Sequence, residues 1–385
     1  MSLSPHAYHY VITGMGCAGL SLAVQLDRAG LLKGRKLLLL DKDRKNLNDR
    51  TWCFWETTPG PFEEIVYRRW NQAWFHAEGF SSLLNLSPYQ YKMIRGIDYY
   101  HHCLDILQQN DSVDIVYAPV DRLTQENGTA SVRAGGIDYT AEWVFNSILF
   151  EKPARDPRKY HLLQHFKGWV VETEVDFFRP EEPTLMDFRP SQEHGTTFVY
   201  VMPFSTRRAL VEYTLFSPAL LSQQAYENGL RDYLTRQMGA PDFKILDVEF
   251  GIIPMTNQPF QHSKNAIIQM GTAGGQTKAS SGYTYSFIQK QTADIVQSLK
   301  TKGHPHHRMR PGTGRFHWYD SVLLNILHHR KLEGWYIFRQ LFRKNKASTI
   351  LRFLDNDTNL SQEIGLLNSL PQWPFMKAGV QEFLR

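Results

Sequence analysis

The strongest constraint on this chain is a glycine triplet near its N-terminus. Residues 11–26 read VITGMGCAGLSLAVQL, with Gly14, Gly16 and Gly19 in G-x-G-x-x-G spacing. In such a motif the first glycine permits a tight turn, the second lets the backbone approach a pyrophosphate, and the third allows the helix to pack closely on the strand. Amide groups and the positive dipole end of the helix then favour phosphate. The triplet therefore predicts a dinucleotide site.

The residues around the triplet supply the expected secondary structure. Apolar periodicity predicts a buried strand at 8–14, a helix over 17–30 that ends near Gly30, and a second buried strand at 36–43. Asp41 lies twenty-two positions after Gly19, at the end of the second strand. A carboxylate at this point accepts hydrogen bonds from a ribose hydroxyl, so Asp41 is the predicted ribose ligand. Asp43 is the less favoured candidate.

The rest of the composition limits the class of protein. At 385 residues the chain is long enough for two interleaved domains with a cleft between them. Its three cysteines form no C-x-x-C pair and are too few for a disulfide framework. No apolar run approaches a membrane span, and no signal peptide is recognisable at the N-terminus. We therefore expect a cytoplasmic protein that does not cross a membrane.

A second glycine-rich stretch decides between the two common dinucleotides. Residues 269–299 read QMGTAGGQTKASSGYTYSFIQKQTADIVQSL, a loop followed by a helical pattern. Flavoproteins with an N-terminal β-α-β unit use such a late loop to hold the flavin, so FAD is favoured over NAD. We expect contacts from Gly271, Gly274 and Gly275, and from Thr272 in place of the more usual aspartate, with a weaker hydroxyl contact. Ser280 or Ser281 is the expected helix cap.

Between the cofactor segments lies a predicted antiparallel hairpin. Its strands, in residues 195–205 and 208–217, are rich in β-branched and aromatic residues, and neither face is clearly polar. The second strand places Glu212 among apolar side chains. Burial would raise the pKa of this carboxyl. From the pattern alone, a solvated glutamate at the rim and a functional glutamate are equally good interpretations.

Six segments together resemble the bacterial lycopene β-cyclases. They are VITGMGCAGLSLAVQL, LLLLDKDRKNLNDRTWCFW, VYVMPFSTRRALVEYTLFS, GIIPM, GTAGGQTKASSGYTYSFIQ and FLDNDTNLSQEIGLLNSLPQWPFMKA, and they occur in family order. The resemblance implies an FAD-dependent carotenoid cyclase that converts the linear ends of lycopene into β-ionone rings without net redox change. It implies that FAD is active in its reduced form, with NAD(P)H as the reductant. Glu212, in LVEYT, matches the family's acidic position and is the predicted general acid.

The resemblance also implies an α/β fold of the flavoprotein monooxygenase type, with a Rossmann-like FAD domain interleaved with an antiparallel-sheet substrate domain. The FAD domain is expected at 1–75, 111–160 and 256–303. A substrate or cap segment is expected at 76–110 and the antiparallel sheet at 161–255. Residues 304–385 are expected to form a helical C-terminal region with a candidate membrane contact.

Aromatic residues near these motifs have two interpretations. RTWCFWE, residues 50–56, is either a packed core cluster or a segment in which Arg50 approaches FAD while Trp52 and Phe54 line the substrate tunnel. Tyr200 and Met202 of the hairpin are further predicted tunnel residues. Cys53 is treated as structural. YYHHC and GHPHHR lack metal-ligand spacing, so no metal is predicted.

Positive charge is concentrated in one region. Residues 300–353 contain twelve Lys and Arg against two acids, and 335–346 place apolar residues at helical spacing with basic flanks. Such a helix either packs its apolar stripe on the domain or lies on an anionic membrane. Since lycopene is a hydrocarbon stored in bilayers, the resemblance favours peripheral membrane attachment around residues 325–354. No nucleic-acid reader motif accompanies the charge.

Two rival functions remain at this level. An FAD-dependent monooxygenase acting on a small aromatic compound shares the fold, and would consume oxygen and NAD(P)H with product. A non-catalytic flavin- or carotenoid-binding protein would bind lycopene without converting it. An acid in an otherwise apolar strand favours the cyclase over both.

Overall fold

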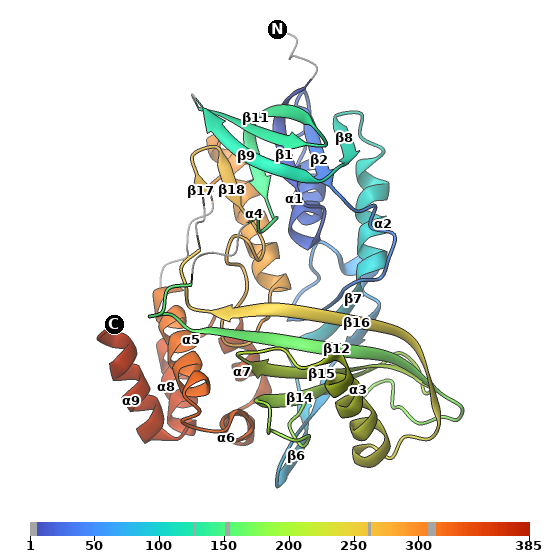
Figure 1. The fold of residues 1–385 in the computed structure, drawn as a ribbon, viewed down its shortest axis with the longest axis vertical. Coiled ribbons are helices and arrows are strands. Elements are labelled where there is room, and N and C mark those ends of the chain that lie inside the picture. The colour runs from blue at the N-terminus through green and yellow to red at the C-terminus, as the bar shows by residue number, and fades with distance from the viewer. Residues whose placement is uncertain (1–5, 127, 151–154, 261–262, 307–312) are drawn as a thin grey trace.

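The computed structural model describes residues 6–126, 128–150, 155–260, 263–306 and 313–385, and arranges them in two large sheets, one small sheet and a C-terminal group of helices (Figure 1). One large sheet carries the glycine triplet. The other carries Glu212 and lies beneath the first in Figure 1. A Rossmann-like α/β unit interleaved with an antiparallel sheet and followed by helices is the predicted fold class, and the prediction is confirmed.

The sheet that carries the glycine triplet is built around parallel strands. Its order is β17 (Ser263–Lys264), β18 (Ile267–Gln269), β11 (Ile137–Asn146), β1 (Ala7–Thr13), β2 (Leu37–Asp41) and β8 (Val113–Tyr117), with β10 (Thr129–Ala134) paired to β11 and β9 (Val120–Glu126) paired to β10. β1 runs parallel to both β2 and β11. The predicted strand, helix, strand unit is therefore confirmed, and β2 is buried throughout, as expected for a central parallel strand.

Three helices surround the first turn of this sheet. α1 (Cys17–Arg28) follows the glycine triplet and packs on α2 (Gly96–Leu107) and α4 (Tyr285–Lys302). α2 falls within the predicted cap segment, but its contact with α1 places it beside the sheet that carries the glycine triplet. A small antiparallel sheet joins this region to the second large sheet, in the order β3 (Thr51–Glu56), β7 (Gln90–Arg95) and β4 (Arg68–Trp70).

The second large sheet has seven strands. Its order is β16 (Phe243–Thr256), β12 (His161–Thr173), β15 (Arg208–Ser217), β14 (Thr196–Pro203), β13 (Thr184–Asp187), β5 (Gln72–Ala77) and β6 (Phe80–Asn85). β14 and β15 form the predicted antiparallel hairpin, and nearly every residue in it is buried. α3 (Gln223–Asp232), continued by a π-helical turn at Tyr233–Gln237, covers the face of this sheet opposite to Glu212.

The C-terminal region is helical, as predicted. It contains α5 (Thr313–His328), α6 (Gly334–Lys344), α7 (Ala347–Leu354), α8 (Leu360–Ser369) and α9 (Gln372–Phe383). α6 is the predicted basic amphipathic helix, and its apolar stripe packs on β5 and β14. Phe338 stacks on Phe188, and Phe342 stacks on Phe75, so the stripe belongs to the protein core. The packed-helix interpretation of this segment is therefore the one that the structure supports.

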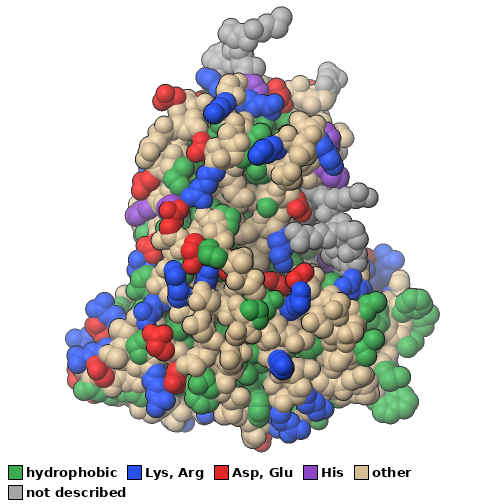
Figure 2. Space-filling model, turned by 180° about the vertical axis from the view of Figure 1, so that it is seen from behind, with side chains coloured by type: hydrophobic (Ala, Val, Ile, Leu, Met, Phe, Trp, Pro, Cys, Tyr) green, Lys and Arg blue, Asp and Glu red, His purple; other side chains and the backbone are tan. Residues whose placement is uncertain are grey.

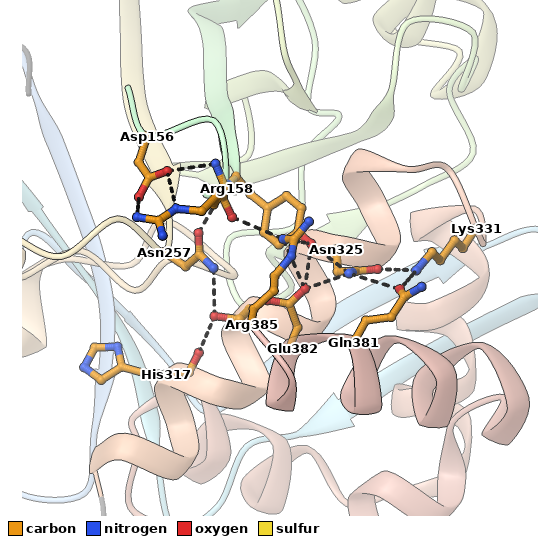
Figure 3. Close-up of polar contacts among 11 residues, drawn as sticks. Asp156, Arg158, Asn257, His317, Asn325, Lys331, Gln381, Glu382 and Arg385 are labelled. Carbon is orange, nitrogen blue, oxygen red and sulfur yellow. Dashed lines mark hydrogen bonds and ion pairs between the residues drawn. The ribbon is translucent and has the colours of Figure 1, made fainter. Parts of the chain in front are cut away.

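α9 is held to the rest of the molecule through its polar face (Figure 3). Glu382 accepts hydrogen bonds from Tyr160 (2.6 Å) and from Asn325 of α5 (2.7 Å), and Arg385 approaches the same tyrosine. Gly379 lies against the ring of Trp318 on α5, where a Cβ atom would meet the ring at 3.1 Å. The last helix is thus a fixed part of the molecule.

Candidate functional site

A cavity of about 460 Å³ lies where the two large sheets face each other. Its walls come from the turn before α1, the segment leading into β3, the Glu212 face of the second sheet, and the loop between β18 and α4. The predicted site residues that line it are Gly16, Arg50, Trp52, Tyr200, Met202, Glu212, Gly271 and Thr272. Residues that are far apart in the sequence, predicted from separate motifs, therefore meet in one cavity.

The glycine triplet has the backbone geometry that its spacing predicted. Gly14 has φ of 91°, and a side chain there would meet the Ser147 hydroxyl at 2.4 Å, so the turn requires glycine. A Cβ atom on Gly19 would lie 2.0 Å from the carbonyl oxygen of Gly14, which is why the helix can pack on the turn. Gly16 has open space where a side chain would be, and it is the N-cap of α1 without a side-chain hydrogen bond. The turn therefore leaves room for a ligand at the first amides of the helix.

Asp41 lies at the end of β2 beside this turn. Its Oδ2 accepts a hydrogen bond from the Met15 amide (2.6 Å) and lies 3.1 Å from the ammonium of Lys45, and its Oδ1 accepts from the Asp43 amide (2.9 Å). The carboxylate thus fixes the conformation of the glycine turn. A ribose contact by Asp41 remains a prediction.

The late loop contributes only part of its predicted set to the cavity. Gly271 has φ of 56° and approaches Ala18 of α1, while Thr272 lies on the cavity wall. Gly274 closes the turn against the carbonyl of Gln269, and Gly275 lines a second cavity of about 530 Å³ on the other side of the loop. Of the predicted loop residues, only Gly271 and Thr272 therefore line the cavity in which the cofactor is predicted to bind.

The predicted cap of the following helix is wrong. α4 begins after Thr284, which makes no side-chain capping hydrogen bond, whereas Ser280 and Ser281 lie in the preceding turn. That turn is closed by the Lys278 and Tyr283 backbones, so the chain needs several more residues before it can enter the helix. Ser281 instead lines the main cavity.

Unpaired polar atoms mark the cavity wall as a place for a polar ligand. Among the described residues, the buried atoms Tyr91 Oη, Gln164 Oε1 and Ser281 Oγ have no hydrogen-bond partner, and all three residues line the cavity. Buried polar groups are normally paired, because leaving one unpaired costs about 1–3 kcal/mol. Together with the open glycine turn, these atoms fit a cofactor that carries hydrogen-bonding groups along its length, as FAD does.

The aromatic segment of β3 divides between cavity and core. Trp52 lines the cavity and makes edge contacts with Tyr99 and Tyr100 at centroid distances of 5.1 and 5.8 Å. Phe54, a predicted tunnel residue, does not line it. Its ring is 4% exposed and stacks on Tyr285 of α4 at 4.1 Å, so it joins the cofactor domain's core. Arg50 is on the wall and exposed.

Glu212 belongs to a row of residues that crosses four strands. The pairing register places Tyr200 of β14 beside Glu212 of β15, Glu212 beside Gly168 of β12, and Gly168 beside Glu249 of β16. A Cβ atom on Gly168 would lie 2.8 Å from the Cγ of Glu249. Because Gly168 has no side chain, the two glutamates can lean towards each other across the intervening strand.

The electrostatic surroundings of Glu212 favour its protonated form. Burial, then the carboxyl of Glu249, raises the pKa of Glu212 well above its ordinary value, and the hydrogen bond from the Thr214 hydroxyl (2.8 Å) opposes this shift. Glu249 accepts a hydrogen bond from the Thr51 hydroxyl (2.8 Å), and burial raises its pKa as well. Glu249 is not among the residues predicted from the sequence. Its one visible signal is its position two residues before the GIIPM motif, in EFGIIPM.

No group of three or more potential metal ligands occurs among the residues that the structure describes. The GHPHHR cluster ends at His307 and Arg308, which lie outside those residues.

Comparison with known proteins gives a family and a fold. The model of the lycopene cyclase protein family matches residues 10–379. A lycopene β-cyclase of Paracoccus sp. (strain N81106 / MBIC 01143) is 26% identical over 236 residues, which is 56% of this chain and 58% of that enzyme. The chain thus matches less than two thirds of that relative's length.

Solved structures with a similar fold include flavoproteins. A flavoprotein/dehydrogenase from Cytophaga hutchinsonii has a TM-score of 0.66 at 10% identity, covering 98% of this chain and 99% of the other. HpxO of Klebsiella pneumoniae, complexed with FAD, has a TM-score of 0.56 at 15% identity, covering 94% and 99% of the two chains.

Proposed function

The chain belongs to the lycopene cyclase family, and we propose from this premise that it is a lycopene β-cyclase. It would convert the linear ψ-ends of lycopene into β-ionone rings, through γ-carotene to β-carotene, without net oxidation or reduction. The observation that carries the proposal is Glu212. This carboxyl is buried and held protonated, and it lines the same cavity as the glycine turn.

Glu212 performs the chemistry as a general acid. The Thr214 hydroxyl donates to its Oε1, which leaves Oε2 to carry the acidic proton. Transfer of this proton to a terminal alkene carbon makes a tertiary carbocation, and attack by the neighbouring double bond closes the ring. Loss of a proton from the ring carbon restores a double bond. Tyr200 and Met202 exclude water from the acid, and the Tyr200 ring presents an electron-rich face to a cation.

The residues that would hold FAD line the cavity around this acid. We propose that the turn at Gly14, Gly16 and Gly19 binds the pyrophosphate, and that Gly271 and Thr272 lie against the flavin end. When bound in its reduced form, FAD supplies negative charge that stabilises a carbocation electrostatically. NAD(P)H is the proposed source of the reducing electrons.

The proposal is tested by anaerobic incubation of the purified protein with lycopene in liposomes, with FAD either oxidised or reduced by dithionite, followed by chromatography of the pigments. β-Carotene formed only with reduced FAD is the expected result. Equal conversion with oxidised FAD would contradict the role of the reduced flavin. No conversion in either state, together with oxygen-dependent NAD(P)H consumption on aromatic compounds, would favour the monooxygenase.

Glu212→Gln is the matching variant. Removal of a general acid lowers rates by about 10²–10⁴-fold, so cyclisation should fall by that factor while FAD binding is retained. Glu174→Gln, which changes an exposed glutamate just after β12, should keep wild-type activity. Wild-type turnover by Glu212→Gln would remove Glu212 from the mechanism.

Lycopene partitions into bilayers, so we also propose that the protein attaches peripherally to a membrane. No helix among the described residues is long and apolar enough to cross one. The segment 325–354 does not offer its apolar stripe, because that stripe is in the core. Hydrophobic side chains gather instead over the edge formed by the C-terminal helices, at the right of Figure 2.

α9 provides most of this exposed apolar surface. Trp373 is 81% exposed and Phe383 is 82% exposed. At 3.6 residues per turn, Trp373 lies on the side of the helix opposite to Glu382, and Phe383 lies about a quarter turn from Glu382. Other exposed large apolar residues of this C-terminal region are Trp318, Leu360, Ile364, Met376, Val380 and Leu384. Lys377 lies on the same side of α9, which suits the anionic headgroups of a bilayer.

Sedimentation with vesicles of phosphatidylcholine and anionic lipid tests this surface. The double variant Trp373→Glu with Phe383→Glu should lower vesicle binding by roughly tenfold or more, because burial of each ring is worth about 1.5–3 kcal/mol. Val175→Glu, at an exposed apolar residue elsewhere on the molecule, is the control. Unchanged binding by the double variant would show that α9 is not the attachment surface.

A further inference from the structure

We propose that Glu249 is a positioning residue for the reaction: the two carboxyls of Glu212 and Glu249 share one proton, and the charge on Glu249 keeps that proton on Glu212. This inference rests on the proposed function only for the substrate that receives the proton. The proximity of the two carboxyls follows from the strand order and register of the sheet, and does not depend on the proposed function.

The geometry gives each carboxyl one occupied and one uncommitted oxygen. Glu212 Oε1 accepts from the Thr214 hydroxyl at 2.8 Å, and Glu249 Oε2 accepts from the Thr51 hydroxyl at 2.8 Å. Glu249 Oε1 is buried and has no hydrogen-bond partner among the described residues. Gly168 is the residue of β12 that pairs with both acids, Glu212 on one side and Glu249 on the other, and it has no side chain to separate them. If one proton lies between the two uncommitted oxygens, the carboxyls are hydrogen-bonded to each other. The buried pair then carries a single negative charge, which this hydrogen bond stabilises.

The other groups around the pair decide which acid holds the proton. The groups that face Glu212 are the thiol of Cys53 on β3 and the phenols of Tyr200 and Tyr283, and burial raises the pKa of each, so all three are neutral. Glu249 faces Arg50, whose positive charge favours its ionised form, and Asp247 on its own strand, whose charge opposes it. The Thr51 hydrogen bond also favours ionised Glu249.

The ionised member of the pair is therefore Glu249, and the acid is Glu212. Glu212 carries the stronger upward pKa shift, and it is the member that lines the cavity, whereas Glu249 does not. Glu249 acts on the reaction through Glu212 and contacts no substrate atom.

The pair also defines where the second proton goes. When the Glu212 O–H bond breaks and a C–H bond forms on the alkene, the pair becomes two carboxylates side by side. Their repulsion makes Glu212 a strong base, so it takes the proton released from the ring carbon as the new double bond forms. One proton leaves and one returns to the same carboxyl, and no oxidant or reductant is consumed in the cycle.

Glu249→Gln tests the proposal on the FAD-bound protein. This variant keeps the shape of the side chain and removes its charge, so Glu212 should ionise at lower pH. In a plot of cyclisation rate against pH, the decline on the basic side should move to lower pH by about one unit or more. At a fixed pH above that decline, the rate should therefore fall about tenfold. Glu249→Asp, which retains the charge, should restore the decline towards its wild-type position, and Glu174→Gln should leave it unmoved.

An infrared titration tests the pair without any turnover. The carbonyl stretch of a protonated carboxylic acid, assigned to Glu212 by its absence in Glu212→Gln, should disappear at lower pH in Glu249→Gln than in wild type. Thr51→Val, which removes only the hydroxyl that donates to Glu249, should move the proton towards Glu249 and weaken the Glu212 band. If neither variant changes the band, Glu249 does not influence the protonation of Glu212 and the proposal is wrong. Failure of lycopene conversion with the band shift intact would instead overturn the proposed function alone.

Discussion

The clearest stability prediction concerns a buried ion pair beneath the late loop. Lys278 lies in the loop between β18 and α4, and its ammonium donates to Asp320 of α5 (2.8 Å) and to Asn356 (2.7 Å). The Lys278 side chain is 0% exposed and that of Asp320 is 5% exposed. Rings of Phe316 and Phe353 lie 5.9 and 5.8 Å from the ammonium. One lysine thus ties the cofactor loop to the C-terminal helices.

The perturbation is Lys278→Met. It leaves the carboxylate of Asp320 buried without a cation, and breaking a buried pair in this way costs about 3–5 kcal/mol. Replacing both partners with apolar groups is close to neutral, because neither charge then has to be desolvated. Lys278→Met combined with Asp320→Leu should therefore recover most of the lost free energy of unfolding.

Urea unfolding followed by circular dichroism measures the effect, with the slope of the transition monitored to detect a change in the unfolded state. Lys33→Met, at an exposed lysine, is the control and should change the free energy of unfolding by about 0.5 kcal/mol or less. A loss below about 1 kcal/mol for Lys278→Met, or a double variant as unstable as the single one, would refute the reasoning from burial and pairing.

Two further predictions concern buried titratable groups. Burial raises the pKa of Asp355 to about 6, so its folded form binds a proton more tightly than its unfolded form, and stability falls as pH rises from about 4 to 6. Asp355→Asn should therefore be more stable than wild type at pH 7.5, by up to about 3 kcal/mol, and the gap in urea unfolding should close below about pH 4. Burial lowers the pKa of His165 to about 4, where Ser217 and Tyr226 hold the neutral ring, so stability falls as pH drops from about 6.5 to 4. His165→Gln should flatten that part of a plot of melting temperature against pH, and an unchanged slope would contradict the assignment.

The sequence predicted the parts of the fold that depend on local pattern. The turn at Gly14, the helix after it and the strand ending at Asp41 follow from glycine spacing and apolar periodicity within about thirty residues. The hairpin around Glu212 follows from β-branched composition and a polar turn. In these segments the chain's local preference and its tertiary environment agree.

The pairing of Glu212 with Glu249 could not be read in the same way. The two residues belong to β15 and β16, which are not neighbours but lie on either side of β12. Their proximity depends on the strand order and on the register of Gly168, neither of which is written in a local pattern. Glu249 also lies on an edge strand that is half-exposed, so its surroundings in sequence resemble those of a solvated acid.

The basic amphipathic helix shows a different limit. Apolar residues at helical spacing indicate that one face is covered, but not by what. α6 meets β5 and β14, whose aromatic side chains Phe75 and Phe188 complete the contact from distant parts of the chain. In α9 the same kind of stripe has no such partner among the described residues, and it remains exposed.

The strand order of the sheet that carries the glycine triplet has a consequence for synthesis of the chain. β1 leaves the ribosome first, but its neighbour β11 is more than one hundred residues later, and β18, which pairs with β11, is later still. α4, which packs on α1, follows β18. A nascent chain that has completed the whole antiparallel sheet at Thr256 therefore still holds the glycine turn without its late loop, and with α2 but not α4 available to pack on α1. Such long-range pairings form slowly, so the cavity between the two large sheets is assembled late, and ribosome-bound chains ending before Tyr285 should be cleaved by protease within the first forty residues.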